Sequence, residues 1–156
     1  MKKKIVQASA SLLLILALTW AVPALAGGKP LAVNLDWRNV VPAGSGDPNV
    51  FGDASVWVHA GQGQLCWEIR AVYYQSAWPP TGAFIHRGSA GVNGPVVIAL
   101  GAPIPPPDSY VATGCTSASV ELLKDIQRKP SNYYLQITNE THPGGATRGQ
   151  LGGQGI

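Results

Sequence analysis

The chain has 156 residues, of which only 12% are charged, while Gly (19) and Pro (13) are abundant. This balance excludes a helical bundle or a coiled coil and favours an all-β domain with many tight turns. A hydrophobic share of 46% and the four tryptophans beyond residue 26 argue against a disordered chain. The length is that of one domain, which excludes a two-domain organisation.

Residues 1–26 have the pattern of a signal peptide. The lysines Lys2–Lys4 precede an apolar stretch that includes Leu12–Leu18, and the small residues of Ala24–Ala26 form a cleavage site. The alternative is an uncleaved membrane anchor, but the unbroken apolar run is shorter than the ~20 residues that span a bilayer. We therefore expect cleavage after Ala26, a single mature domain over residues 27–156, a secreted or periplasmic location, and no stable membrane insertion.

The charge of the mature chain differs from that of the whole chain. The formal net charge of +3 includes Lys2–Lys4, which leave with the signal peptide, so the remaining eight basic residues balance the eight acidic ones. The longest basic run in the mature chain is Arg128-Lys129. Surfaces that bind nucleic acids carry clustered positive charge, so we expect no nucleic-acid partner.

Two cysteines, Cys66 and Cys115, belong to the mature chain. Two cysteines in an oxidising compartment allow one intramolecular disulfide. We expect this bond to form and to tie a covering loop onto the outer side of the sheet. The alternative is a redox-active pair, although reactive cysteines usually lie close together in the sequence, as in a Cys-x-x-Cys motif.

Alternating apolar residues predict seven short strands. A period of two is typical of a half-buried strand, and Gly61–Gly63 between two such segments predicts a hairpin. The continuous apolar run of Pro95–Leu100 predicts a strand covered on both sides. The predicted strands are Leu31–Trp37, Ala54–Val58, Leu65–Ala71, Ala83–Arg87, Pro95–Leu100, Tyr133–Ile137 and Ala146–Leu151.

One helix is predicted over Ala118–Arg128. Its apolar residues recur at helical spacing on one stripe, and Pro130 ends the run. The proline-rich residues 101–109 before it are predicted to be loop, because proline lacks an amide donor. Seven strands with one helical crossover predict an all-β Greek-key sandwich. The candidate N-cap residues of the helix are Thr116, Ser117 and Ser119.

Several segments, in this order, are similar to a known family. They are Gly63–Ile69, Pro80–Val97, Gly114-Cys115, Tyr133-Tyr134 and Pro143–Leu151. Together they resemble the CHRD domain, which is named after the extracellular protein chordin and also occurs in secreted microbial proteins. The resemblance implies an immunoglobulin-like or superoxide-dismutase-like sandwich and a secreted protein, and it implies no reaction.

Four residues in these segments belong to the family-like motifs without an assigned role: His86, Arg87, Arg148 and Gln150. Both arginines precede a glycine. The planar guanidinium can donate hydrogen bonds to backbone carbonyls or to buried carboxylates. The same geometry also allows it to bind a ligand. We expect structural partners, with ligand binding as the alternative.

The resemblance also marks three positions where family members commonly carry histidine, namely Phe84, His86 and Thr138. This chain keeps only His86, and its other histidines, His59 and His142, lie on separate segments without ligand spacing. Zinc sites in proteins typically have three or four protein ligands. We therefore expect no metal and no other cofactor.

No set of residues with assignable catalytic roles is recognisable. A Gly-x-Ser-x-Gly motif is absent from the sequence, and the acidic residues are scattered. The aromatic residues offer core packing or, where exposed, a surface for sugars or proteins, and Trp57 is the candidate for exposure. We expect a secreted non-catalytic binding or structural module whose partner is an unknown extracellular or envelope protein or glycan. The alternative is a superoxide-dismutase-like metal-binding protein or enzyme.

Overall fold

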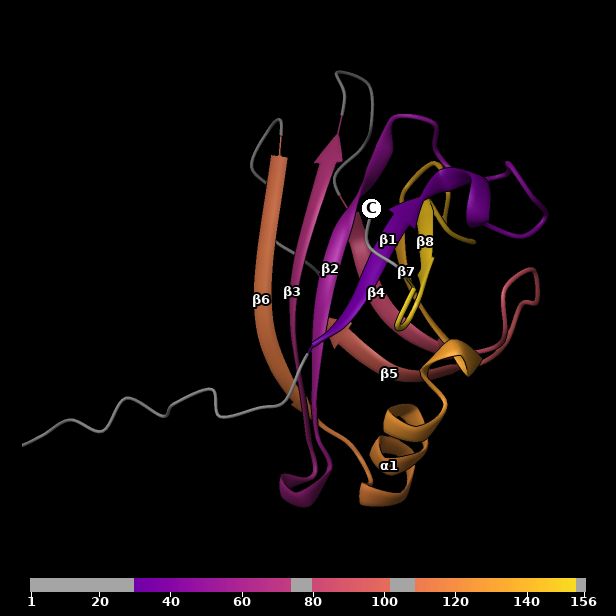
Figure 1. Cartoon of the computed structure of the whole chain (residues 1–156). Coiled ribbons are helices and arrows are strands. Elements are labelled where there is room, and N and C mark those ends of the chain that lie inside the picture. Colours follow the sequence, from indigo (N-terminus) through magenta and orange to yellow (C-terminus); the bar gives the residue numbers. More distant parts are fainter. Residues whose placement is uncertain (1–29, 74–79, 102–108, 154–156) are drawn as a thin grey trace, which may run out of the picture.

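The computed structural model describes residues 30–73, 80–101 and 109–153. These residues form eight strands, one α-helix and three short 3-10 helices (Figure 1). The predicted signal peptide and its cleavage site lie outside the described residues. The strands are β1 (Leu31–Asp36), β2 (Val50–His59), β3 (Gln64–Tyr73), β4 (Pro80–Arg87), β5 (Val96–Gly101), β6 (Ser109–Ser117), β7 (Tyr133–Asn139) and β8 (Thr147–Gln150). The helices are α1 (Val120–Arg128), η1 (Trp37–Asn39), η2 (Ala60–Gln62) and η3 (Pro130–Asn132).

All eight strands belong to one antiparallel sheet with the order β5-β4-β7-β8-β1-β2-β3-β6. The sheet folds over on itself, and its two end strands, β5 and β6, approach each other, so the molecule is a sandwich close to a closed barrel (Figure 1). Strands β4 and β5, which follow β3 in the sequence, form a hairpin at the other end of the sheet order. The chain then returns, and β6 pairs with β3, which is a Greek-key connection. The predicted all-β Greek-key sandwich is confirmed, with eight strands in the described residues instead of about seven.

The core lies between the two halves of the curled sheet. Inward-facing residues such as Leu35 on β1, Ile69 on β3 and Leu135 on β7 are fully buried. The predicted helix is confirmed as α1, which covers one end of the sandwich with Leu123 and Ile126 (Figure 1). Among the described residues, no helix has the length and apolar character needed to cross a membrane.

The Ser119 side chain caps the start of α1. Its hydroxyl oxygen accepts a hydrogen bond from the Leu122 amide at 3.2 Å. Of the three candidate N-cap residues, Ser119 therefore fills the role, because it alone directly precedes the first helical residue.

Strand β6 is the one that the alternation pattern did not predict. It pairs with β3 along its length, with Cys115 opposite Cys66 and Gly114 opposite Trp67. A Cβ atom on Gly114 would lie 2.5 Å from the Trp67 ring, so the indole fills the space that an apolar side chain of β6 would otherwise occupy. The segment consequently lacks the apolar alternation that indicates a strand.

The Cys66–Cys115 disulfide is formed, as expected, but its position differs from the prediction. Because the two cysteines are ladder partners on β3 and β6, the bond joins neighbouring strands. The expectation that it ties a covering loop onto the sheet is therefore wrong.

The prediction that Pro95–Leu100 forms a strand covered on both sides is also wrong. Strand β5 lies at one end of the sheet order. Ile98 and Leu100 point into the core, whereas Val96 and Ala99 are exposed. Its continuous apolar sequence is therefore that of an edge strand with one buried face.

Candidate functional site

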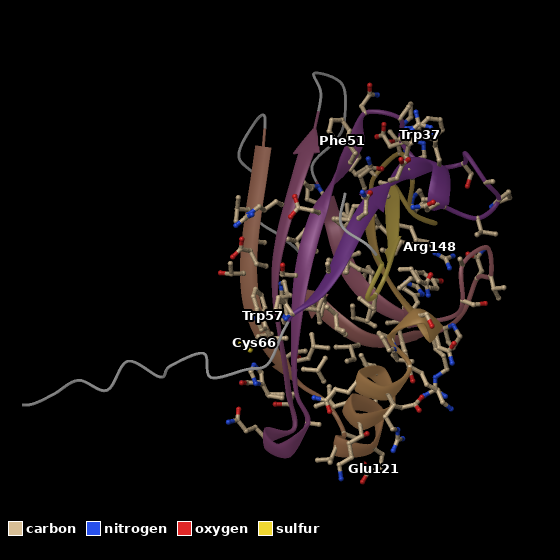
Figure 2. All side chains as sticks on the ribbon, viewed as in Figure 1. Trp37, Phe51, Trp57, Cys66, Glu121 and Arg148 are labelled. Atoms are coloured by element: carbon tan, nitrogen blue, oxygen red, sulfur yellow. A yellow bond between two sulfur atoms is a disulfide. The ribbon has the colours of Figure 1, made fainter. Side chains whose placement is uncertain are left out.

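The outer face of β4, β7 and β8 is unusual because several of its large side chains are buried. Part of this face is covered by residues 88–94, the glycine loop, which leads from β4 towards β5 and folds back over the sheet. Figure 2 shows Arg148 on β8, on the side of the molecule where this loop lies. The side chains of this face that are at most 9% exposed are His86, Tyr134, Gln136, Thr138 and Arg148.

Three of these side chains form a stack, which we call the outer stack: His86, Tyr134 and Arg148. Strand β7 lies between β4 and β8, so Tyr134 has His86 on one neighbouring strand and Arg148 on the other. The His86 and Tyr134 rings are parallel within 9°, with centroids 4.7 Å apart. The Arg148 guanidinium carbon lies 3.4 Å from the Tyr134 ring centroid, which is a close cation–π contact.

His86 holds the end of the glycine loop. Its Nδ1 atom lies 2.9 Å from the carbonyl oxygen of Gly94. Because a carbonyl oxygen only accepts, Nδ1 carries the proton and Nε2 is left as an acceptor. Nε2 is buried and has no hydrogen-bond partner among the described residues.

The surroundings of His86 favour its neutral form. Burial holds the pKa of His86 below its ordinary value of 6.5, and the positive charge of Arg148 acts in the same direction. The hydrogen bond to Gly94 opposes this effect and is smaller. At neutral pH the imidazole is therefore an uncharged member of the stack.

Arg148 holds the middle of the glycine loop. Its Nη2 atom donates to the carbonyl oxygens of Ser89 and Val92, both at 2.9 Å. Its Nη1 atom donates to Oδ1 of Asn93 at 3.4 Å. Burial lowers the pKa of the Arg148 guanidinium below its usual value. The expectation that this arginine has backbone carbonyls as partners is thus met by its contacts.

Gln150 fixes the start of the same loop, and Arg87 does not take part. The Gln150 side-chain amide donates to the carbonyl oxygen of Gly88 at 2.8 Å and to that of Tyr133 at 2.8 Å. Arg87 is exposed, with its guanidinium 5.6 Å from the Tyr133 ring centroid. Of the four motif residues, three therefore hold the glycine loop.

Glycine is required where the loop ends. A Cβ atom on Gly94 would lie 1.6 Å from the Arg87 carbonyl oxygen. Gly91, at the loop tip, has a φ of +75°, a conformation that other residues rarely adopt. The glycine-rich sequence thus reflects the close approach of this loop to the sheet.

A pocket of about 230 Å³ opens between the glycine loop and the segment that follows β1. Arg148 and Gln150 line it from β8, and Ala90 and Gly91 line it from the glycine loop. The side-chain amide of Asn93 donates to the Val41 carbonyl oxygen at 3.1 Å, which links the two segments. The lining residues from the segment after β1 are Arg38, Asn39, Val40, Val41 and Ala43.

No local sequence pattern predicts this second wall of the pocket. Residues 38–43 carry neither a periodic pattern nor a family-like motif. They reach the site because β1 pairs with β8 through Asp36 and Arg148. This is a long-range pairing that local sequence signals do not reveal.

The three positions marked by the family resemblance lie close together on the outer face of β4 and β7. Phe84 and His86 meet edge to face, with ring centroids 6.2 Å apart and planes at 80°. The Phe84 ring covers Gly82, whose ladder partner is Thr138. An aromatic hydrocarbon therefore fills the place where a second imidazole would lie, and the described residues contain no group of three or more His, Cys, Asp or Glu residues able to hold a metal ion.

A second polar cluster surrounds Asp47. The buried carboxylate accepts a hydrogen bond from the Asn139 side chain at 2.8 Å. His142 Nδ1 lies 3.7 Å from the same carboxylate and 2.9 Å from the Thr141 hydroxyl. Ser45 and His142 also line a pocket of about 280 Å³. The 3.7 Å separation is too long for a hydrogen bond, so the pair lacks the aspartate–histidine contact that a hydrolytic triad uses.

The tryptophans within the described residues are distributed over the molecule. Trp67 belongs to the core, whereas Trp37 and Trp57 are half-buried. Figure 2 shows Trp57 beside Cys66, its ladder partner, and Trp37 at the other end of the molecule. These two rings therefore do not form one binding face. Tyr74, Trp78 and the side chain of Tyr73 lie outside the described part of the chain.

Comparison with protein families decides the assignment that the motifs suggested. The family model of the CHRD domain matches residues 31–151. The chain belongs to the CHRD family. Searches of the curated proteins and of the solved structures gave no match.

The CHRD match includes every strand described above, the disulfide, the outer stack and the glycine loop. CHRD domains are binding or structural modules and are generally non-catalytic. The three motif residues that hold the glycine loop are therefore part of a CHRD domain, in which Arg148 and Gln150 also line a surface pocket.

Proposed function

We propose that this CHRD domain acts after export as a non-catalytic binding module, and that it captures an extracellular or envelope component at the pocket beside the glycine loop. The observation that supports this role is the use made of the motif residues. His86, Arg148 and Gln150 all donate to carbonyl oxygens of the glycine loop, which forms one wall of the pocket. The motif thus maintains a binding surface.

The same contacts argue against a catalytic role. A general acid or base has to come within hydrogen-bond distance of its substrate. His86 is only 9% exposed, and its Nδ1 proton is donated to the Gly94 carbonyl oxygen. Arg148 is 1% exposed, and its Nη2 atom donates to two backbone carbonyls. Both groups are fixed by the fold of the loop.

Export is supported by the signal-peptide pattern of residues 1–26 and by the disulfide, a bond typical of oxidising compartments. We expect the mature protein to begin at Gly27 and to be found in the periplasm or in the medium. N-terminal sequencing of the purified protein tests this expectation. An intact chain that begins at Met1 and stays embedded in the membrane would contradict it.

Filling the pocket should abolish capture of the partner. Ala90 is exposed at the rim, so Ala90→Trp places an indole in the pocket without disturbing the core. Immobilised wild-type domain and variant are exposed to the same envelope and medium extracts. We expect a component that the wild type retains and that Ala90→Trp binds at least ~10-fold more weakly, equivalent to 1.4 kcal/mol.

The matched control is Thr113→Trp, which adds the same indole to the exposed outer face of β6. This variant should retain the component as the wild type does. Equal retention by the wild type and Ala90→Trp would show that the pocket is not the binding site.

The dismutase-like alternative is tested by metal content. With Phe84 and Thr138 at two of the three marked positions, the wild type should bind no stoichiometric copper or zinc and have no dismutase activity. The double variant Phe84→His, Thr138→His should bind copper or zinc more tightly than the wild type. The buried Nε2 of His86 supports this expectation, because metal-bound histidines commonly donate their other nitrogen to a carbonyl, as His86 does.

Elemental analysis and calorimetry on the wild type and the double variant provide the measurement. One tightly bound metal ion per wild-type chain would overturn the non-catalytic proposal. It would also make His86 the first ligand to substitute.

A further inference from the structure

We infer that the free edge of β6 is a self-association surface, at which two copies of the chain pair β6 against β6 and join their sheets across a two-fold axis. This surface is separate from the pocket of the proposed function. Figure 1 shows β6 at one side of the molecule and the segment after β1, which lines the pocket, at the other.

Strand β6 pairs on one side only. It lies at one end of the sheet order and forms its ladder with β3. Figure 1 shows β6 at the left margin of the molecule, with β3 beside it. Strand β5 approaches β6 but forms no ladder with it. The backbone groups on the free side of β6 therefore have no partner strand within the described residues.

The hydrogen-bond pattern identifies the residues whose backbone faces this free edge. The Ala118 amide donates to the Gly63 carbonyl oxygen at 3.0 Å, and hydrogen-bonded pairs alternate along an antiparallel ladder. The even-numbered residues of β6 therefore bond to β3, whereas Val111, Thr113 and Cys115 direct their N–H and C=O groups away from it. The Cα atoms of the two disulfide-bonded cysteines lie 4.0 Å apart, close to the ~4.5 Å of a pair without mutual hydrogen bonds.

Strand β6 lacks the features that usually protect a free edge. Natural edges are protected by charged residues, proline, bulges or short length. The nine residues of β6 include no charge and no proline, and its ladder with β3 runs without a register shift. Val111, Thr113 and Cys115 are exposed, and Val111 is 62% exposed. This long, regular and uncharged edge is therefore suited to pair with a further strand.

Strand β5, at the other end of the sheet order, is protected. It has six residues, and its ladder with β4 is interrupted by register shifts between Ala83 and Phe84 and between Ile85 and His86. Such irregularities disrupt continuous pairing with a further strand. Of the two ends of the sheet, β6 is thus the one that is open to association.

The occupant that fits this edge is a second copy of the chain. Because β6 carries no charge, it brings no like charges together when it pairs with itself. The eight basic residues of the mature chain balance its eight acidic ones, so two whole copies do not repel each other through net charge. Antiparallel pairing of one strand with its own copy uses the same surface twice and closes after two chains, which gives a dimer rather than a filament.

The neighbouring side chains favour one register. On the ladder between β3 and β6, Glu68 lies opposite Thr113 and Arg70 lies opposite Val111. When Val111 of one copy faces Thr113 of the other, two β-branched side chains meet across the new pair. Each row of the joined sheets then contains Arg70 from one copy and Glu68 from the other. A slide by two residues, with Thr113 facing Thr113, would place Glu68 of both copies in one row.

The dimer should be weak. Standard interfaces bury about 1,200–2,000 Å², whereas an edge contact contributes mainly hydrogen bonds between backbones and covers little apolar surface besides Val111. We therefore expect a dissociation constant in the micromolar range.

Sedimentation of the purified mature protein, from low micromolar to submillimolar concentration, measures the association. Val111→Lys adds a like charge to each copy at the new pair. The matched control is Val96→Lys, which adds the same charge at a 50% exposed valine on β5. We expect the wild type and Val96→Lys to approach the dimer mass as the concentration rises, and Val111→Lys to associate at least ~10-fold more weakly.

Amide hydrogen exchange of the wild type tests the geometry without any substitution. In dilute solution the amides of Val111 and Thr113 should exchange rapidly, whereas those of Ala112 and Gly114, which face β3, should be protected. At concentrations where the dimer forms, the amides of Val111 and Thr113 should gain at least ~10-fold protection, because each then donates to the second copy.

A wild type that stays monomeric over the whole concentration range would overturn the inference, as would equal association of Val111→Lys and Val96→Lys. If Val111→Lys does not fold, hydrogen exchange of the wild type decides, and edge amides that exchange equally fast at all concentrations overturn the inference. Edge amides that gain protection only when an envelope extract is added would overturn it too, because the edge would then bind a foreign chain and not a second copy.

Discussion

Removing the Cys66–Cys115 disulfide should lower the free energy of unfolding by about 2–4 kcal/mol. The bond spans 49 residues of sequence, and a cross-link of this span removes many conformations from the unfolded chain. The two cysteines already face each other as ladder partners. The effect should therefore come mainly from the unfolded state, with the native fold retained in the variant.

The consequence should be largest for β6. This strand lies at one end of the sheet order, and its inward-facing residues include Ala112 and Gly114, which bury little apolar surface of their own. Without the disulfide, β6 depends on its ladder hydrogen bonds with β3. In hydrogen exchange, its amides should then lose protection before those of β7.

Urea unfolding of the wild type and of Cys66→Ala, Cys115→Ala, each with and without reductant, measures the effect. Reductant should destabilise the wild type and leave the stability of the double variant unchanged. The double variant therefore serves as the control for effects of the reductant other than loss of the disulfide. Equal unfolding midpoints of the oxidised wild type and the double variant would contradict the expectation.

The strands that sequence analysis predicted are those whose own side chains fill the core. On β1, Val33 and Leu35 are buried, while Ala32, Asn34 and Asp36 are partly exposed. The alternation therefore records the burial directly. On β6 the core is filled from the neighbouring strand by Trp67 over Gly114, so the signal for this strand lies in the sequence of its partner.

The residues that hold the glycine loop were predictable from the sequence, whereas the second wall of the pocket and the arrangement of the site were not. The family-like motifs include His86, Arg148 and Gln150. The period of two along a strand places His86 and Arg148 on the outer face of the sheet, where side chains are expected to be exposed. They are buried because the glycine loop folds over them. Which loop covers a sheet face depends on long-range contacts, and these have no local sequence pattern.

Replacing Arg148 with alanine should lower the free energy of unfolding by about 3 kcal/mol. Three losses contribute. The variant leaves a cavity beside Tyr134, removes the cation–π contact at 3.4 Å, and leaves the carbonyl oxygens of Ser89 and Val92 without their donor. The relief of a buried charge offsets part of these losses, which keeps the expected effect well below their sum.

The Arg148→Lys variant tests whether the geometry or the charge holds the loop. Lysine keeps the positive charge, but its compact ammonium group lacks the planar fork that spans two carbonyls and covers a ring. We expect it to restore less than half of the lost stability. The matched control is Arg87→Ala, since Arg87 also precedes a glycine in a family-like motif but is exposed, and its loss should cost less than about 0.5 kcal/mol.

Urea unfolding of the three variants gives the free energies, and proteolysis of the native proteins reports on residues 88–94. The Arg148 variants should be cleaved faster in this loop, whereas Arg87→Ala should behave as the wild type does. If Arg148→Ala and Arg87→Ala cost the same and leave the loop equally resistant, the loop is held by its glycine backbone and by His86 and Gln150. Arg148 would then not be needed to hold the loop in the free protein, and its positive charge would be its only contribution.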